Sequence, residues 1–190
     1  MRLALKQTAV EDEKCISATR AWLERAVIGL NLCPFAKAVH AKNQIRYVVS
    51  TAQTPQDLLT DLVAELRTLH AADASVIDTT LLVHPQVLGD FLDFNDFLEL
   101  ADAAIAAEGL AGEIQIASFH PQYQFAGTRP EDIENCSNRS PYPTLHLLRE
   151  ASIERAVAVF PDAAQIYERN IDTLRRLGHD GWRRVTEGED

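Results

Sequence analysis

The sequence predicts a helix-rich α/β domain, in which residues 1–190 form one small, three-stranded parallel sheet flanked by about six helices. Short apolar stretches at 45–50, 78–83 and 113–119 are typical of strands. Helical periodicity separates each stretch from the next, which is the pattern of βαβ units with parallel strands. A chain of 190 residues with 46% hydrophobic composition is long enough to bury one core without disulfides.

Capping residues and helix breakers place the helices around these strands. We expect the first helix to begin near Glu11, through a capping box with Thr8. A short helix over 34–42 would have Pro34 at its first position and Cys33 as its N-cap. A third helix is expected after Thr54, and a fourth over 94–108, between a cap at Asp93 and a stop at Gly109. The last two are expected over 145–159 and over 161–177, with Gly178 as the stop of the final helix.

Charge and cysteine content narrow the class of protein. Lys and Arg number 18 against 28 Asp and Glu, and a net charge of −10 disfavours binding to nucleic acid. No apolar stretch approaches the length of a membrane span, and the N-terminus lacks the pattern of a secretory signal. Three widely spaced cysteines suit a reducing compartment. We therefore expect a cytoplasmic protein that binds neither nucleic acid nor membranes; its oligomeric state is left open.

Two His-Pro pairs follow predicted strands directly. His84 follows the second strand and His120 follows the third, so both are expected at the carboxyl edge of the sheet, where α/β proteins usually bind ligands. Two imidazoles at one edge could act as acid and base, or as ligands of a divalent metal such as zinc or iron. The alternative is that each His-Pro pair only terminates a strand.

A long loop over 120–144 leaves the same edge and holds four of the eight prolines. A loop of this length in a compact domain is often functional, and we expect it to fold over the carboxyl edge. Its candidate substrate-binding residues are Arg129, Arg139, Asn138, Tyr123 and Tyr142. The two arginines could clamp a small anionic molecule, or they could pair with acidic residues of the loop and hold it closed.

His146 and Cys33 complete the candidate catalytic residues. In the predicted helix capped by Thr144, His146 lies in the first turn with Glu150 one turn later, either as a neutral base or as half of an exposed pair. At the start of a short helix, the Cys33 thiol would have a lowered pKa and could be a nucleophile or a ligand. The alternative for Cys33 is a small buried residue that fills the junction.

Three segments resemble one family: GLNLCPFAKAV at 29–39, SFHPQYQFAGT at 118–128 and NRSPYPTLHLLRE at 138–150. They are similar to domain-of-unknown-function family 1415 over about residues 22–185. The resemblance implies that Cys33, His120, Arg139 and His146 form one site, and it supplies no reaction. It also implies that Cys136, where the family commonly holds an aromatic residue, is not essential.

Three functions remain as hypotheses, and whether the protein is an enzyme is left open. The first is an enzyme that acts on a small anionic molecule, with His84, His120, Cys33 and His146 as its catalytic residues. The second is a module that binds a small anion or a protein without catalysis. The third is a thiol redox protein that uses Cys33. Dinucleotide-binding, P-loop and hydrolase-elbow motifs are absent from the sequence.

Overall fold

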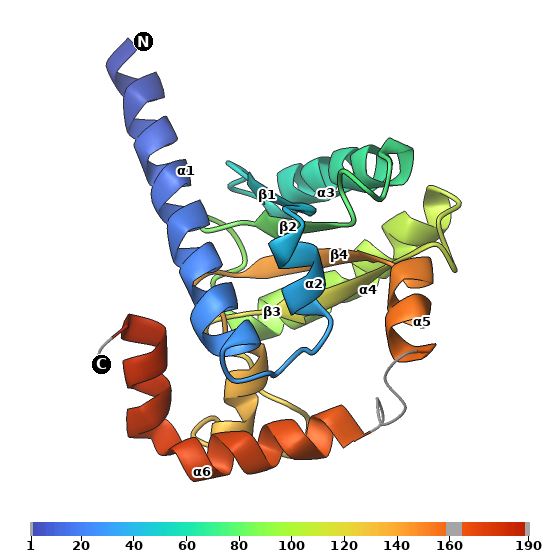
Figure 1. Cartoon of the computed structure of the whole chain (residues 1–190). Coiled ribbons are helices and arrows are strands. Elements are labelled where there is room, and N and C mark those ends of the chain that lie inside the picture. The colour runs from blue at the N-terminus through green and yellow to red at the C-terminus, as the bar shows by residue number, and fades with distance from the viewer. Residues whose placement is uncertain (1, 159–164, 189–190) are drawn as a thin grey trace.

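The structure is a computed structural model that describes residues 2–158 and 165–188. Its centre is a four-stranded mixed sheet with the order β1-β2-β4-β3 (Figure 1). The strands are β1 (Ile45–Val49), β2 (Thr79–Val83), β3 (Ile114–Phe119) and β4 (Thr144–Arg149). β1 and β2 are parallel, and β4 runs antiparallel to both β2 and β3. β1, β2 and β3 therefore share one direction.

The α/β class and the places of the three predicted strands are confirmed, but the three-stranded parallel sheet is wrong. The missing strand is β4, which lies between β2 and β3 in a stretch predicted to start a helix. Leu145 and Leu147 face one side of the sheet and are fully buried, while His146 and Leu148 face the other side. A central strand with apolar residues on both faces lacks the alternation that marks a half-exposed strand.

α3 (Pro55–Ala71) and α4 (Phe91–Ala107) cover one face of this sheet. As predicted, Thr54 caps α3 by accepting a hydrogen bond from the backbone N–H of Asp57. α4 begins three residues earlier than expected, because its cap is Asp90 and not Asp93. The predicted stop is confirmed at Gly109, which has a φ of 73° just beyond the helix end.

α1 (Arg2–Trp22), the π-helix η1 (Leu23–Ile28) and the short α2 (Ala36–Ala41) lie on the other face. Trp22 and its neighbours in η1 pack against Phe119 and Tyr47 of the sheet. The expected start near Glu11 is wrong, since α1 begins at Arg2 and its first turns project beyond the sheet (Figure 1). The expected cap is also wrong: α2 is preceded by Phe35, and Cys33 lies in the turn before it.

The C-terminal part contains α5 (Glu150–Ala158) and α6 (Ile166–Glu187). Of the predicted helix over 161–177, residues 161–164 lie outside the described residues, and α6 bends at Gly178 with a φ of 67° where an end was expected. α6 packs against η1 and against the 3₁₀-helix η2 (Ile133–Asn138) of the long loop. Among the described residues, no helix has both the length and the apolar content needed to span a bilayer.

Candidate functional site

His84 and His120 lie at one edge of the sheet, as predicted. His84 follows the last residue of β2 and His120 the last residue of β3, and β4 starts between them because Thr144 pairs with both strand ends. Both side chains are fully buried. The ring of Phe94 lies between them, with centroids 5.6 Å from His84 and 5.1 Å from His120. The two imidazoles therefore belong to the core that joins the sheet to α4.

Hydrogen bonds fix the tautomer of each imidazole. The backbone N–H of Gln122 donates to Nδ1 of His120 at 3.0 Å, so Nε2 carries the proton and donates to the Leu88 carbonyl at 3.2 Å. Nδ1 of His84 donates to the Val87 carbonyl at 3.0 Å, which leaves its Nε2 as a bare acceptor. Among the residues described, this Nε2 atom has no hydrogen-bond partner.

Burial holds both histidines neutral. Desolvation lowers the pKa of His84 from 6.5 to about 4, and the neighbouring His120 acts in the same direction. The pKa of His120 is also lowered, mainly by burial, although the hydrogen bond to Leu88 and the charge of Asp90 oppose that shift. Both imidazoles hold the loop between β2 and α4 through consecutive carbonyls, and Leu88 adopts a left-handed backbone with a φ of 56°.

His146 does not join this pair. It lies within β4, where it pairs with Leu81 and Ala117 and faces α1 and not α4. Its Nε2 is 2.7 Å from the Thr79 hydroxyl, which itself donates to the Leu147 carbonyl, so His146 is the donor. Burial lowers the pKa of His146 to about 4. The expected helix-start position with Glu150 one turn later is wrong because residue 146 is in a strand.

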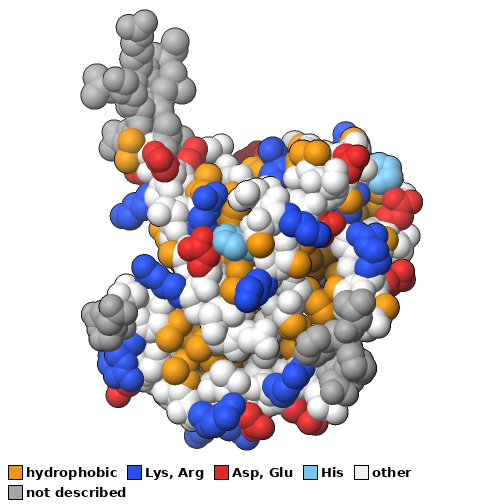
Figure 2. Space-filling model, in the orientation of Figure 1, with side chains coloured by type: hydrophobic (Ala, Val, Ile, Leu, Met, Phe, Trp, Pro, Cys, Tyr) orange, Lys and Arg blue, Asp and Glu red, His pale blue; other side chains and the backbone are white. Residues whose placement is uncertain are grey.

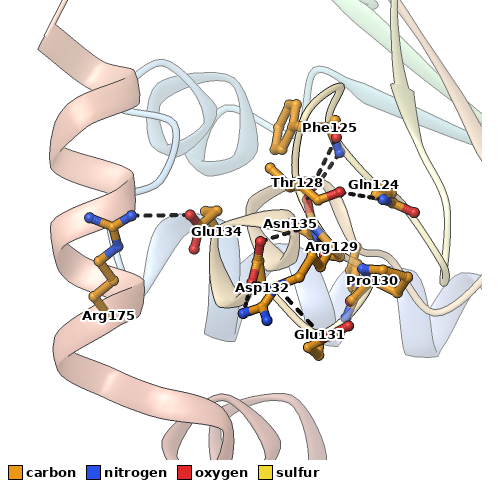
Figure 3. A network of polar contacts seen from close by, with 11 residues as sticks. Gln124, Phe125, Thr128, Arg129, Pro130, Glu131, Asp132, Glu134, Asn135 and Arg175 are labelled. Atoms are coloured by element: carbon orange, nitrogen blue, oxygen red, sulfur yellow. Dashed lines mark hydrogen bonds and ion pairs between the residues drawn. The ribbon is translucent and has the colours of Figure 1, made fainter.

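The long loop over 120–144 is ordered by internal contacts around Asn135 (Figure 3). The side chain of Asn135 is fully buried and accepts hydrogen bonds from the Phe125 N–H and the Thr128 hydroxyl, at 3.0 and 2.8 Å. Its amide donates to the Arg129 carbonyl at 2.7 Å. Sequence analysis missed Asn135, since one amide among many polar loop residues carries no distinguishing pattern.

The two loop arginines are occupied by the loop itself. Arg129 is exposed and pairs with Asp132 at 3.0 Å and with Glu131 at 3.6 Å. Arg139 donates to the backbone carbonyls of Tyr123 and Pro130. The ion pairs of Arg129 are those of the alternative in which acidic residues hold the loop closed. Arg139 also holds the loop, but through backbone carbonyls and not through the acidic partners that the alternative expected.

The other expected substrate-binding residues also make structural contacts. The side-chain amide of Asn138 donates to the Ser118 carbonyl. The backbone carbonyl of Asn138 accepts from the backbone N–H of His120. Tyr123 packs between Phe91 and Phe125. The Tyr142 hydroxyl lies beside the Cys15 thiol of α1. These contacts join the loop to the sheet and the helices. A role of the three residues in ligand binding stays a prediction.

Cys33 packs with Trp22 and its neighbours on the α1 side of the sheet. Burial raises the pKa of its thiol, and hydrogen bonds from the backbone of Phe35 and Ala36 oppose that change only in part. The expected lowered pKa is therefore wrong, because the thiol is desolvated and does not cap a helix. The thiol redox hypothesis depends on a Cys33 thiol with a lowered pKa, and the folded protein raises that pKa instead.

A metal at His84 and His120 would need further ligands. Among the residues that the structure describes, no three side chains of His, Cys, Asp or Glu lie close enough together to hold one ion. The proposal of zinc or iron at this edge therefore gains no support from the described side chains.

A surface cleft lies elsewhere, between the turn that follows η1 and the first three turns of α6. Its volume is about 160 Å³. The turn contributes Leu30, Asn31 and Pro34 to its wall. The α6 side is formed by Ile166, Arg169, Asn170, Asp172, Thr173 and Arg176. Arginines, amides and a hydroxyl are side chains that donate hydrogen bonds to an anion.

The backbone conformation of the turn beside the cleft explains two of its residues. A Cβ at Gly29 would overlap the Arg25 carbonyl at the end of the π-helix, so only glycine fits there. Asn31 adopts a left-handed backbone with a φ of 54°, which asparagine tolerates better than most residues. The Asn170 amide donates to the Leu32 carbonyl at 2.9 Å. This bond joins the turn directly to α6.

A small apolar cluster lies next to the cleft. Leu32, Cys136 and Leu174 are buried together where the turn, η2 and α6 meet. An ion pair of 3.1 Å between Arg175 and Glu134 adds a second link from α6 to the long loop (Figure 3). The walls of the cleft are therefore held by packing and hydrogen bonds, which is the usual property of a preformed ligand site.

The cleft could not be predicted from the sequence, for a topological reason. The segment 29–39 was singled out for Cys33, and its neighbours Asn31 and Pro34 line the cleft instead. The only available signal was the spacing of Arg169, Thr173 and Arg176, which places the three on one face of a helix. Nothing in the sequence shows that this face meets residues more than 130 positions earlier.

The charge of the protein is unevenly distributed. Residues 51–119, which include α3 and α4, contain twelve acidic residues and one basic residue, Arg67. The rest of the chain contains 16 acidic and 17 basic residues. Figure 2 shows Lys and Arg side chains spread over the face that carries α1 and α2, with a group along the edge formed by α6. The strong net negative charge is thus concentrated away from the cleft.

The fold and its two sites define an α/β protein with a buried histidine pair at the carboxyl edge and a basic surface cleft. The chain belongs to the family described as "Protein of unknown function (DUF1415)", which it matches over residues 14–184. This match confirms the resemblance carried by the three segments. Neither the curated proteins nor the solved structures gave a match to the chain.

Proposed function

We propose that this protein binds a small anionic molecule in the cleft between the turn after η1 and α6. The observation that carries the proposal is the pair Arg169 and Arg176, which line one surface cleft together with Asn31 and Thr173. Guanidinium groups form strong charge-assisted hydrogen bonds with carboxylates and phosphates. This is the anion-binding hypothesis of the sequence analysis, moved from the long loop to α6.

Electrostatics and size both support the proposal. The acidic residues of α3 and α4 lie on the opposite side of the sheet, where their repulsion of an anion at α6 is weakened by distance and salt. A volume of about 160 Å³ is below the 300–1,000 Å³ of usual drug-sized sites, so the ligand is a small metabolite. Rigid walls reduce the ordering cost of binding.

Replacing Arg176 is expected to weaken anion binding at least tenfold. In Arg176→Gln the side chain keeps a hydrogen-bonding amide but loses its charge, and a hydrogen bond to a charged group contributes about 1.5–3 kcal/mol. Pentanoate and inorganic phosphate are suitable probes, and isothermal titration calorimetry measures both affinities. Arg176 is exposed, and its Nε bonds to the Asp172 carbonyl one turn earlier on the same helix, so the fold is expected to remain intact.

Arg183→Gln is the matched control. Arg183 is an exposed arginine of the same helix, lies beyond the bend at Gly178, and pairs with Asp180 at 2.6 Å. Its replacement is expected to leave the affinity of either anion unchanged. Equal losses in the two variants would indicate a diffuse charge effect and would reject the cleft as the binding site.

The catalytic roles assigned to His84, His120, His146 and Cys33 stay predictions. The bare Nε2 of His84 is the one feature that favours acid–base chemistry, and it lies in a fully buried ring. Our proposal therefore concerns binding and assigns no reaction. The three cysteines are all free, which supports the proposed cytoplasmic location.

A further inference from the structure

The cleft contains one side chain that a site for simple anions would not need. Asp172 lies between Arg169 and Arg176 in the lining, three residues after the first and four before the second. Asp172 is exposed, and in the described part of the chain its observed hydrogen bond is made by its backbone carbonyl and not by its carboxylate. A carboxylate in this position weakens the binding of phosphate dianions and dicarboxylates.

We infer that the ligand is a zwitterion of the size of an α-amino acid, an inference that rests on the proposed function. Its carboxylate would bind the guanidinium groups of Arg169 and Arg176, and its ammonium would bind the carboxylate of Asp172. Each charge of the ligand then meets an opposite charge, and the otherwise unfavourable Asp172 becomes the group that selects the ligand.

The spacing on α6 suits a molecule whose two charged groups lie on one carbon. Residues four apart on a helix have Cβ atoms about 5–6 Å apart, so Arg176 and Asp172 present opposite charges side by side. Arg176 is directed back toward that turn, because its Nε donates to the Asp172 carbonyl at 3.2 Å. The pair therefore forms a compact two-charge recognition unit.

The other walls of the cleft suit an uncharged, short side chain. Leu30, Pro34 and Ile166 supply apolar surface, and no further acidic side chain lines the hollow among the residues described. Asn31 and Thr173 can bond to the ligand carboxylate or to a small polar substituent. The ligand class is thus a small aliphatic or hydroxylated amino acid.

L-Norvaline and pentanoate form the decisive pair of probes, because they have the same carbon chain and differ by the ammonium group. We expect the intact protein to bind norvaline at least tenfold more tightly than pentanoate in calorimetry. Asp172→Asn is expected to lower norvaline affinity about tenfold, the usual effect of one charge-assisted contact, while pentanoate binding is retained or improved. Asp180→Asn, an exposed position beyond the bend, is the control that should change neither.

The outcomes separate this inference from the proposed function. If pentanoate or phosphate binds through Arg176 but norvaline binds no more tightly than pentanoate, the zwitterion is rejected and the anion site stands. A loss of both ligands in Asp172→Asn rejects it as well, since recognition of the ammonium must be selective. If none of the three probes binds the intact protein, both the inference and the proposed function fail.

Discussion

At pH 4.5 the free energy of unfolding is expected to be several kcal/mol lower than at pH 7. The folded protein holds His84 with a pKa of about 4 against 6.5 for an accessible histidine. Between these two values the unfolded chain binds more protons than the folded chain, so stability falls as the pH falls. His84 alone accounts for about 3 kcal/mol at the acid end, and the lowered pKa values of His120 and His146 act in the same direction.

Urea unfolding at a series of pH values measures this dependence. In His84→Asn the side-chain amide can still donate to the Val87 carbonyl, but the titrating group is gone. We expect the slope of stability against pH between 6.5 and 4 to be shallower by about 1.4 kcal/mol per pH unit. His179→Asn removes an exposed histidine and should leave the slope as in the intact protein. Identical slopes in all three proteins would show that His84 is not held neutral by burial.

Asn135→Ala is expected to destabilise the protein by about 2 kcal/mol. The substitution leaves the Phe125 N–H without a partner (Figure 3). The Thr128 hydroxyl can still donate to the Phe125 carbonyl, and the Arg129 carbonyl still accepts from the Asp132 N–H. Each buried polar group that loses its partner costs about 1–3 kcal/mol. Urea unfolding at pH 7 provides the measurement, in which the midpoint of the variant should fall clearly below that of the intact protein.

Asn95→Ala provides the matched control, because Asn95 is an exposed asparagine on the outer side of α4. Its effect is expected to stay within about 0.5 kcal/mol, as for most surface substitutions. A loss below 1 kcal/mol in Asn135→Ala would contradict the view that this one amide organises the loop. If Asn135→Ala shows the expected loss of stability and its anion affinity is unchanged, the loop is a structural element that is separate from the cleft.

Local signals predicted the outer parts of the fold well. β1, β2 and β3 lie within one residue of the predicted strands, and Thr54 and Gly109 bound their helices as expected. β4 was missed because Leu145, Leu147 and Leu148 satisfy a helical and a strand pattern equally. This segment becomes a strand because it pairs with β2 and β3, which lie tens of residues earlier in the chain.

In the candidate site too, positions set by neighbouring residues could be predicted, and positions set by contacts distant in sequence could not. His84 and His120 were placed at one edge correctly, because each follows a strand directly and the strands share a direction. The position of His146 depended on the missed strand, in which His146 faces α1 and points away from the core that holds His84 and His120. The cleft joins Asn31 to Arg176 across most of the chain, a juxtaposition that only packing of α6 creates.

The most direct test of the account is to locate a bound amino acid by nitrogen-15 NMR during a titration with L-norvaline. Binding in the cleft predicts that the shifted backbone amides cluster at residues 30–33 and 166–176, with a saturating dependence on ligand concentration. Shifts that instead cluster at His84, His120 and the loop over 120–144 would place the ligand at the carboxyl edge of the sheet. That result would contradict the cleft and return the site to the buried histidine pair.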